Sequence, residues 1–293
     1  MTVPELGRIG VWGHLDTLPI GEARAYARRA EELGYGCLWV PETVGREPFT
    51  LLGLLAGETT RMALGTSIVS IWGHDAQATR MSAETLAEAT RGRFVLGLGV
   101  SHPHLAAKLR GHEFERPLQR MREYLAAYRS AIYRGPRAGD GTPPVLVAAL
   151  RERMTDLAAT DAAGAFPYLV TAERVKWMRA RLDESASGRR PLLAVTLPVV
   201  LGNDADAARA YLKPYLRTPT YHASWELQGF DASDWELSGS DRLLEAMVAI
   251  GPSARARERI DGLLAAGADH VAVIPIAPDG STEHLPTLEA LAE

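Results

Sequence analysis

The sequence reads ELGYGCLW at residues 32–39 and AGADHVAV at residues 266–273. In both stretches a helical segment ends at a glycine, and an apolar run typical of a strand follows directly. Glycine suits this position because it adopts the left-handed conformation that closes a helix at little cost. The stretch TRGRF at residues 90–94 has the same pattern. Three such junctions predict one helix-to-strand unit repeated along the chain.

Apolar runs alternate with segments of helical periodicity from one end of the chain to the other. Eight strand-like runs, each apolar enough to be buried on both faces, predict an α/β fold, namely a (β/α)8 TIM barrel. A doubly wound open sheet is the alternative. The expected strands are residues 8–12, 37–40, 62–69, 94–99, 145–148, 165–170, 192–200 and 270–276, and the expected helices are residues 20–33, 79–90, 118–133, 152–163, 172–183, 204–215 and 254–266.

Residues 218–240 follow the expected helix 204–215, are rich in aromatic and acidic side chains, and have no clean period. This composition predicts an insertion after the seventh strand, either a surface segment or a lid. Its aromatic side chains could cover an apolar substrate, or they could simply pack against the outside of the barrel. No linker divides the chain, so residues 1–293 are expected to form a single domain. The aromatic residues are Tyr221, Trp225, Phe230 and Trp235.

The composition excludes several classes of protein. The hydrophobic fraction of 46% and the charged fraction of 23% are typical of a globular chain rather than a disordered one. A net charge of −4 argues against a nucleic-acid partner. Cys37 is the single cysteine, which excludes an intramolecular disulfide and a thiolate-rich metal site and fits a cytoplasmic location. The sequence shows neither a signal peptide nor an apolar run long enough to span a membrane.

In a (β/α)8 barrel the active site lies at the carboxyl ends of the strands. Several possible metal ligands follow the expected strands, as a two-metal hydrolase would require. Their spacing matches no metal-binding motif, so histidines facing solvent or substrate are the preferred interpretation and no metal site is expected. These rim residues are His14, Asp16, His74, Asp75, His102 and His104.

Two features suggest a flat ligand. Gly97 and Gly99 form an incomplete dinucleotide fingerprint, which is weak evidence for a Rossmann fold. The two missing side chains could let a flat ligand approach the backbone. The run 64–72 places small hydroxyl side chains among apolar ones, which suits either a packed barrel interior or a bulge pressed against a planar ring.

Residues 34–42, 65–69 and 92–102 resemble the luciferase-like monooxygenase superfamily, and more narrowly its coenzyme F420-dependent oxidoreductases of actinobacterial type. The resemblance covers essentially the whole chain and depends on the order and spacing of several motifs. It implies a (β/α)8 barrel that binds a flavin or deazaflavin at the carboxyl rim, together with a small-molecule substrate. A homodimer is plausible by the same analogy.

The resemblance also implies particular site residues. The family has a non-prolyl cis peptide behind the cofactor ring, and the matching bond here is Ser67–Ile68. The cofactor phosphate is expected at the helix after residues 145–148, because the free N–H groups of a helix start favour an anion. The implied cofactor contacts are Glu42, Ser67, Ile68, Ser70, Gly99, Val100, Ser101, His102, Ala149, Arg151 and Tyr168.

Two departures from the family pattern matter. Close relatives have Gly-Pro after the alanine pair 148–149, whereas this chain has Leu150-Arg151. The lost glycine could crowd the phosphate, although Arg151 or Arg153 could supply a compensating charge. The sugar-phosphate dehydrogenases of the superfamily carry an Asp-His pair and a Glu where this chain has Glu42-Thr43 and His102, so their mechanism is not transferred.

These observations favour an F420-dependent oxidoreductase that moves a hydride between the deazaflavin and a small organic substrate. His102 is the preferred acid or base, because imidazole ordinarily titrates near neutral pH, and Glu42 and His14 are alternates. His102 could equally serve only as a hydrogen-bond partner of the cofactor. The alternatives are an FMN-dependent monooxygenase, a barrel that binds a flavin-like ligand without turnover, and a metal-dependent hydrolase.

Overall fold

The computed structural model describes residues 3–292. The strands are β1 (Ile9–Trp12), β2 (Cys37–Val40), β3 (Ala63–Thr66), β4 (Val69–Ser70), β5 (Phe94–Gly99), β6 (Val145–Val147), β7 (Gly164–Ala165), β8 (Leu192–Leu201), β9 (Ala249–Gly251) and β10 (His270–Ile276). The helices are α1 (Ile20–Glu32), α2 (Pro48–Leu55), α3 (Ala76–Ala89), α4 (Pro117–Ser130), α5 (Glu152–Asp161), α6 (Ala172–Ser185), α7 (Ala205–Leu212), α8 (Pro219–Glu226), α9 (Ala232–Trp235), α10 (Asp241–Met247), α11 (Ser253–Ala265) and α12 (Leu285–Ala292). Single helical turns lie at Leu105–Leu109 and Tyr215–Arg217.

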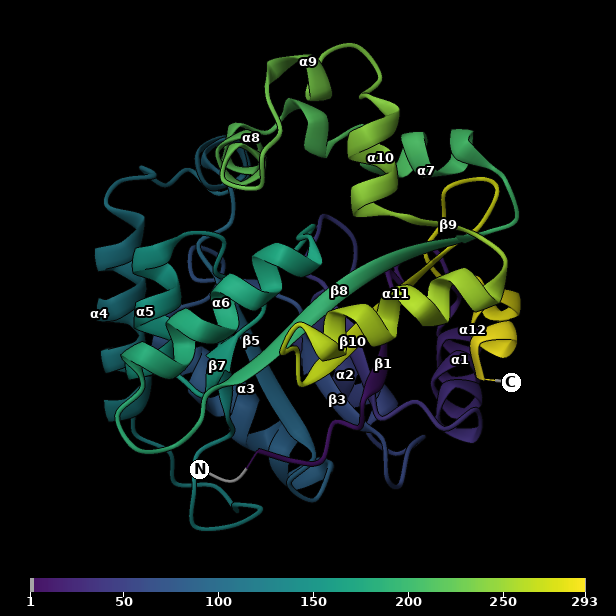
Figure 1. The fold of residues 1–293 in the computed structure, drawn as a ribbon. Coiled ribbons are helices and arrows are strands. Elements are labelled where there is room, and N and C mark those ends of the chain that lie inside the picture. Colours follow the sequence, from purple (N-terminus) through teal and green to yellow (C-terminus); the bar gives the residue numbers. More distant parts are fainter. Residues whose placement is uncertain (1–2, 293) are drawn as a thin grey trace.

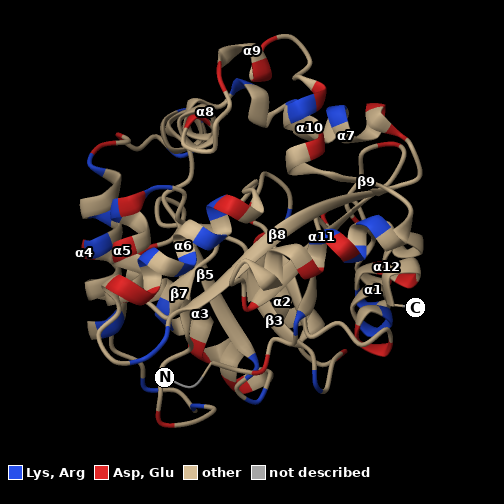
Figure 2. Cartoon of the chain, viewed as in Figure 1, with Lys and Arg blue, Asp and Glu red and all other residues tan. Residues whose placement is uncertain are grey.

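The parallel sheet closes into a barrel because β10 pairs with both β1 and β8. Val271 shows the closure, since it lies opposite Ile9 on one side and Val195 on the other. Helices surround the strands, and Figure 2 shows the charged residues on those helices and on loops rather than on the strands. The predicted (β/α)8 barrel is therefore confirmed, and the open-sheet alternative is wrong.

The third expected strand is interrupted. It ends as β3 at Thr66 and resumes as β4 at Val69, and the peptide bond between Ser67 and Ile68 is cis, as expected. Neighbouring strands hold this bulge: the Trp12 indole N–H donates to the Ser67 carbonyl at 3.1 Å, and the Glu42 N–H donates to the Ile68 carbonyl at 3.2 Å. The bulge is thus fixed by the residues that end β1 and follow β2.

The glycines of β5 make room for the bulge. A Cβ atom at Gly97 would lie 2.0 Å from the Thr66 carbonyl oxygen, and one at Gly99 would lie 2.6 Å from the Ile68 side chain. Protein atoms therefore occupy the space that the two missing side chains leave. The bulge packs against these glycines, and the approach of a flat ligand to their backbone stays a prediction.

The sixth expected strand, residues 165–170, is much shorter than the sequence pattern suggests. Only Gly164–Ala165 pair as β7, and the chain then leaves the sheet. Pro167 has no N–H group to donate to a sheet ladder, and Leu169 has a positive φ of 55°. Phe166 and Leu169 are nevertheless buried. The apolar pattern here reflects burial rather than strand pairing.

The segment 218–240 is more regular than expected, since it contains α8 and α9, and a capping box at Asp231 starts α9. Trp225 is fully buried, and Tyr221 and Phe230 are nearly so. Figure 1 places α7 to α10 over the end of the barrel at which β8 finishes. Other elements that the sequence pattern missed are α2, α10, α12 and β9.

Candidate active site

A cavity of about 570 Å³ lies at the carboxyl ends of the barrel strands. Its size is that of a typical cofactor or small-molecule site, and its position is that of the active site in barrels of this class. Most of the expected site residues line it: His14, Glu42, Ser67, Ile68, Val100, Ser101, His102, Ala149, Arg151 and Tyr168.

Two expected cofactor contacts lie behind this lining. Ser70 is buried, and its N–H donates to Glu42 Oε2 at 2.6 Å. Gly99 is covered by the side chain of Ile68. Neither residue is part of the cavity lining, and both support residues that are, so their contact with a cofactor stays a prediction.

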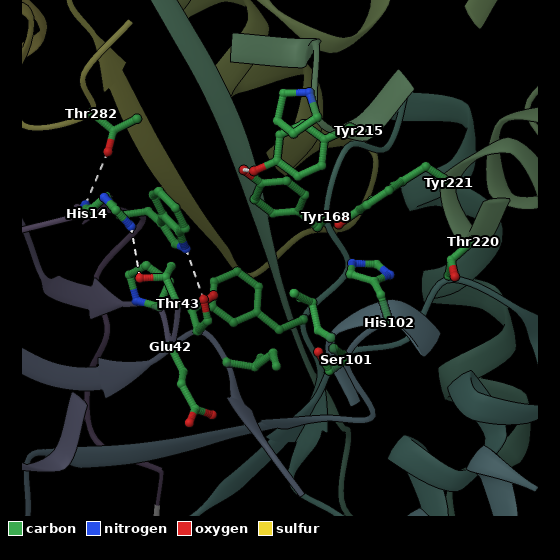
Figure 3. Close-up of a pocket in the computed structure, with 18 of the residues that line it drawn as sticks. His14, Glu42, Thr43, Ser101, His102, Tyr168, Tyr215, Thr220, Tyr221 and Thr282 are labelled. Carbon is green, nitrogen blue, oxygen red and sulfur yellow. Dashed lines mark hydrogen bonds between the residues drawn. The ribbon is translucent and has the colours of Figure 1, made fainter. Parts of the chain in front are cut away.

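Glu42 follows β2 and is only 8% exposed. Its carboxylate accepts a hydrogen bond from Ser70, lies 3.1 Å from His74 Nε2, and pairs with Arg110. Burial opposes ionisation, but the hydrogen bonds from His74 and Ser70 and the charges of His74 and Arg110 outweigh it and hold the pKa of Glu42 below its usual range. Figure 3 shows the carboxylate pointing away from the other labelled side chains. The Glu42 carboxylate is therefore ionised, and both of its oxygens have protein partners.

His102 follows β5, and its ring lies near His104 (6.0 Å between centroids) and Tyr221 (5.4 Å). Its buried Nδ1 atom has no hydrogen-bond partner among residues 3–292. Burial, assisted by the charge of His104, lowers the pKa of His102 to about 4. The imidazole is therefore neutral at pH 7. A neutral imidazole can accept a proton or donate a hydrogen bond, but it is not protonated on both ring nitrogens and so cannot act as a general acid.

His14 lies at the opposite wall, after β1. Its Nε2 atom is 3.1 Å from Thr43 Oγ1 and 3.3 Å from Asp16 Oδ2. The backbone N–H of His14 donates to Thr282 Oγ1 at 3.2 Å, and Figure 3 shows the contacts with Thr43 and Thr282. Thr43 also donates to Asp16 at 2.6 Å. This network ties the loops after β1, β2 and β10 together at the rim.

The possible metal ligands fall into separate places. His14 is next to Asp16, His74 contacts Glu42, and His102 stacks on His104. Asp75 instead caps α3, where it accepts a hydrogen bond from the Ala78 N–H. Within residues 3–292, no three His, Cys, Asp or Glu side chains converge into a group that could hold a metal ion.

Another part of the cavity wall lies at the start of α5 and is formed by Arg151 and Met154 and by the preceding Leu150. This helix start has no side-chain cap, so its first N–H groups remain available as donors. Glu152 lies in the same turn, but it pairs with Arg181 at 3.2 Å. Arg151 is exposed at the cavity edge. The arrangement suits an anionic group.

Sequence reasoning missed two members of a tyrosine cluster that lines the cavity. The Tyr168 hydroxyl lies 3.0 Å from that of Tyr215 and also contacts that of Tyr211, and the Tyr221 ring packs on Tyr215 at 5.2 Å. Burial raises the pKa of all four tyrosines. The four-residue spacing of Tyr211 and Tyr215 was the available signal, because in the expected helix 204–215 it would place both on one face.

Among residues 3–292, no helix combines the length and the apolar character that a membrane crossing requires.

The chain is 27% identical, over 86% of its length and 82% of the relative's, to a Mycobacterium tuberculosis protein provisionally named as a coenzyme F420-dependent oxidoreductase.

Solved structures share the fold. An F420-dependent secondary alcohol dehydrogenase in complex with an F420–acetone adduct matches with a TM-score of 0.77 and 13% identity, over 97% of each chain. The oxygenating constituent of 3,6-diketocamphane monooxygenase from Pseudomonas putida, in complex with FMN, matches with a TM-score of 0.72 and 16% identity, over 98% of this chain and 96% of that one. The model of the luciferase-like monooxygenase family matches residues 5–270. The chain therefore belongs to the luciferase-like monooxygenase family.

Proposed function

We propose that this protein is an F420-dependent oxidoreductase that moves a hydride between the deazaflavin and a small organic substrate. The observation that carries the proposal is the cavity at the barrel mouth, lined by the cis bulge Ser67–Ile68. The resemblance to a relative named for coenzyme F420 over most of both chains supports it. When bound, the cofactor supplies the site that gives or accepts the hydride, and the protein supplies orientation and exclusion of water.

The lining fits a flat, anionic cofactor. Ile68, Val100 and the small Ala148 and Ala149 offer an apolar wall on which a ring can lie. The uncapped start of α5 and the side chain of Arg151 offer donors for a phosphate. We assign the ring to the first set of residues and the phosphate to the second. Glu42 positions the bulge through Ser70 and through its own N–H group, rather than exchanging protons.

We assign the acid–base role to His102. Its side chain lines the cavity, and its buried Nδ1 atom has no partner among the described residues. The expectation of titration near neutral pH does not apply, because burial lowers the pKa of His102 to about 4. A neutral imidazole accepts a proton from substrate as hydride leaves, and the imidazolium so formed returns that proton in the reverse direction. His14 is engaged by Thr43 and Asp16, which favours a role in rim structure.

A monooxygenase that uses reduced FMN and oxygen is the second candidate, because an FMN-bound monooxygenase shares the fold over nearly the whole chain. Titration of the purified protein with F420 and, separately, with FMN distinguishes the two. The proposal predicts saturable binding of F420 and at least tenfold weaker binding of FMN. Tighter binding of FMN supports the monooxygenase, and binding of neither overturns both.

We further propose that residues 218–240 cover the substrate. Thr220 and Tyr221 line the cavity, whereas Trp225 is buried and contacts the rings of Tyr221 and Trp235. The start of the segment thus faces the cavity, while the buried Trp225 anchors the segment by packing. Deletion of this segment is expected to open the cavity to water and to lower turnover more than F420 affinity.

A further inference from the structure

Arg174 is a buried cation on α6 with few partners. It is 6% exposed, its guanidinium lies over the Trp177 ring at 3.8 Å, and its buried Nε atom has no hydrogen-bond partner among residues 3–292. Within the same residues its side chain donates one hydrogen bond, from Nη2 to the Leu150 carbonyl at 2.7 Å. Burying a charge costs free energy unless another group compensates it. In the described chain, that compensation comes from one backbone carbonyl and one aromatic ring.

The Leu150 carbonyl belongs to the turn that starts α5. Leu150 and Arg151 both line the cavity at the barrel mouth, and α6, which carries Arg174, lies beside α5 (Figure 1). The peptide bond between Leu150 and Arg151 is trans, so its C=O and N–H groups point in opposite directions. Because the C=O points to Arg174, the N–H of Arg151 points away from it. No acceptor within residues 3–292 takes this N–H, which is therefore a free donor at the cavity wall.

The charge of Arg174 favours an anion beyond this peptide. Burial lowers the pKa of Arg174, but a guanidinium stays protonated at neutral pH. Glu152 and Glu173 line the same outer cavity as Arg174, yet Glu152 pairs with Arg181 at 3.2 Å and Glu173 is exposed. A hydrogen bond from a cation to a carbonyl polarises the whole peptide group and strengthens its N–H as a donor. The Arg151 N–H is thus both aimed and strengthened from α6.

We propose that Arg174 is the positioning residue of an anion subsite at the start of α5. Arg174 holds the Leu150 carbonyl, and the N–H of the same peptide, that of Arg151, donates to a phosphate group of the ligand. The inference rests on the proposed function, which assigns the cofactor phosphate to this helix start. It adds to that function a residue that does not line the cavity and acts through one peptide group.

The first test titrates the ¹⁵N-labelled protein with inorganic phosphate and follows the Arg151 amide by NMR. In wild type the amide proton should move downfield and saturate. Arg174→Met should weaken phosphate binding at this amide about tenfold, and Arg174→Lys, which keeps the charge, should restore part of it. The matched control is Arg257→Met on α11, because the Arg257 guanidinium also donates to a backbone carbonyl, that of Ala290, at 2.8 Å. This control should match wild type.

The second test compares F420 with the same deazaflavin lacking its phosphate. Arg174→Met should weaken F420 binding about tenfold and leave the affinity for the phosphate-free deazaflavin unchanged. Equal losses for both ligands show a purely structural role and overturn the proposal, as does wild-type phosphate affinity in Arg174→Met. If that variant does not fold, wild type alone decides, because an Arg151 amide that phosphate does not shift also overturns the proposal. A wild type that shows the shift but binds no F420 refutes the proposed cofactor and leaves the anion subsite standing.

Discussion

Replacing Glu42 with glutamine tests the network that holds the bulge. Glu42 is 8% exposed and accepts from Ser70, His74 and Arg110. Removing one partner of a buried ion pair costs about 3–5 kcal/mol. Because the Arg110 side chain is 25% exposed and that of His74 is 18% exposed, water replaces part of the loss. We therefore expect Glu42→Gln to lower the free energy of unfolding by about 2–3 kcal/mol.

The loss should depend on pH in a defined way. The pKa of Glu42 is lowered in the fold, so its contribution is present above the unfolded value of about 4.3 and disappears as pH falls. The pKa of His74 is raised, chiefly by its hydrogen bond to Glu42, so its contribution is present below about 6.5 and is lost as pH rises through the folded value. The difference between wild type and variant should therefore be largest between about pH 4.3 and 6.5.

Urea unfolding at pH 5.5 and pH 8.5 measures the two stabilities, and NMR titration follows the His74 ring. In the variant the His74 pKa should move back toward its ordinary value. Glu115→Gln, on the same loop as Arg110 but exposed, is the matched control and should change stability by less than about 0.5 kcal/mol. An unchanged His74 titration together with wild-type stability at pH 5.5 would refute the reasoning.

Three further variants test other parts of the site. His102→Ala should lower kcat at least ~10²-fold with F420 affinity little changed, and near-normal turnover contradicts its role. In wild type, the pH profile of kcat/KM should show no ionisation from His102 between pH 6 and 8, because its pKa is about 4. Gly97→Ala should lower the free energy of unfolding, measured in urea, by at least about 3 kcal/mol, because the new Cβ would clash with the Thr66 carbonyl oxygen. In the control Gly57→Ala the new Cβ meets open space, and the cost should be less than about 1 kcal/mol. Equal effects of the two substitutions refute the packing argument. Arg151→Ala should weaken F420 binding about tenfold and the exposed Arg134→Ala should not; equal affinities remove Arg151 from the phosphate site.

The alternation of apolar runs was enough to predict the barrel, because burial on both faces leaves a strong signal in the sequence. The same signal misled at residues 165–170, where Pro167 ends the pairing although Phe166 and Leu169 stay buried. The helix α2 was missed because its exposed positions are Thr50, Gly53 and Leu54, which form no strongly polar face to reveal a helical period.

The site was predicted less completely than the fold. The rim residues and the cis bond came from the order of strands and from family resemblance. The roles of Gly97 and Gly99 depend on where Thr66 and Ile68 lie, and the lowered pKa of His102 depends on burial. Neither property is local in sequence. Tyr211 and Tyr215 come from α7 and the turn after it, and only folding brings them to Tyr168.

The central claim is that the cavity lined by Ser67–Ile68 binds a deazaflavin. Calorimetric titration of the purified protein with F420, repeated with a variant in which Ala149→Trp fills the cavity wall, tests this claim most directly. The account predicts saturable binding of about one F420 per chain in wild type and its loss in the folded variant. Absence of F420 binding in wild type, or equal affinity in the variant, would contradict it.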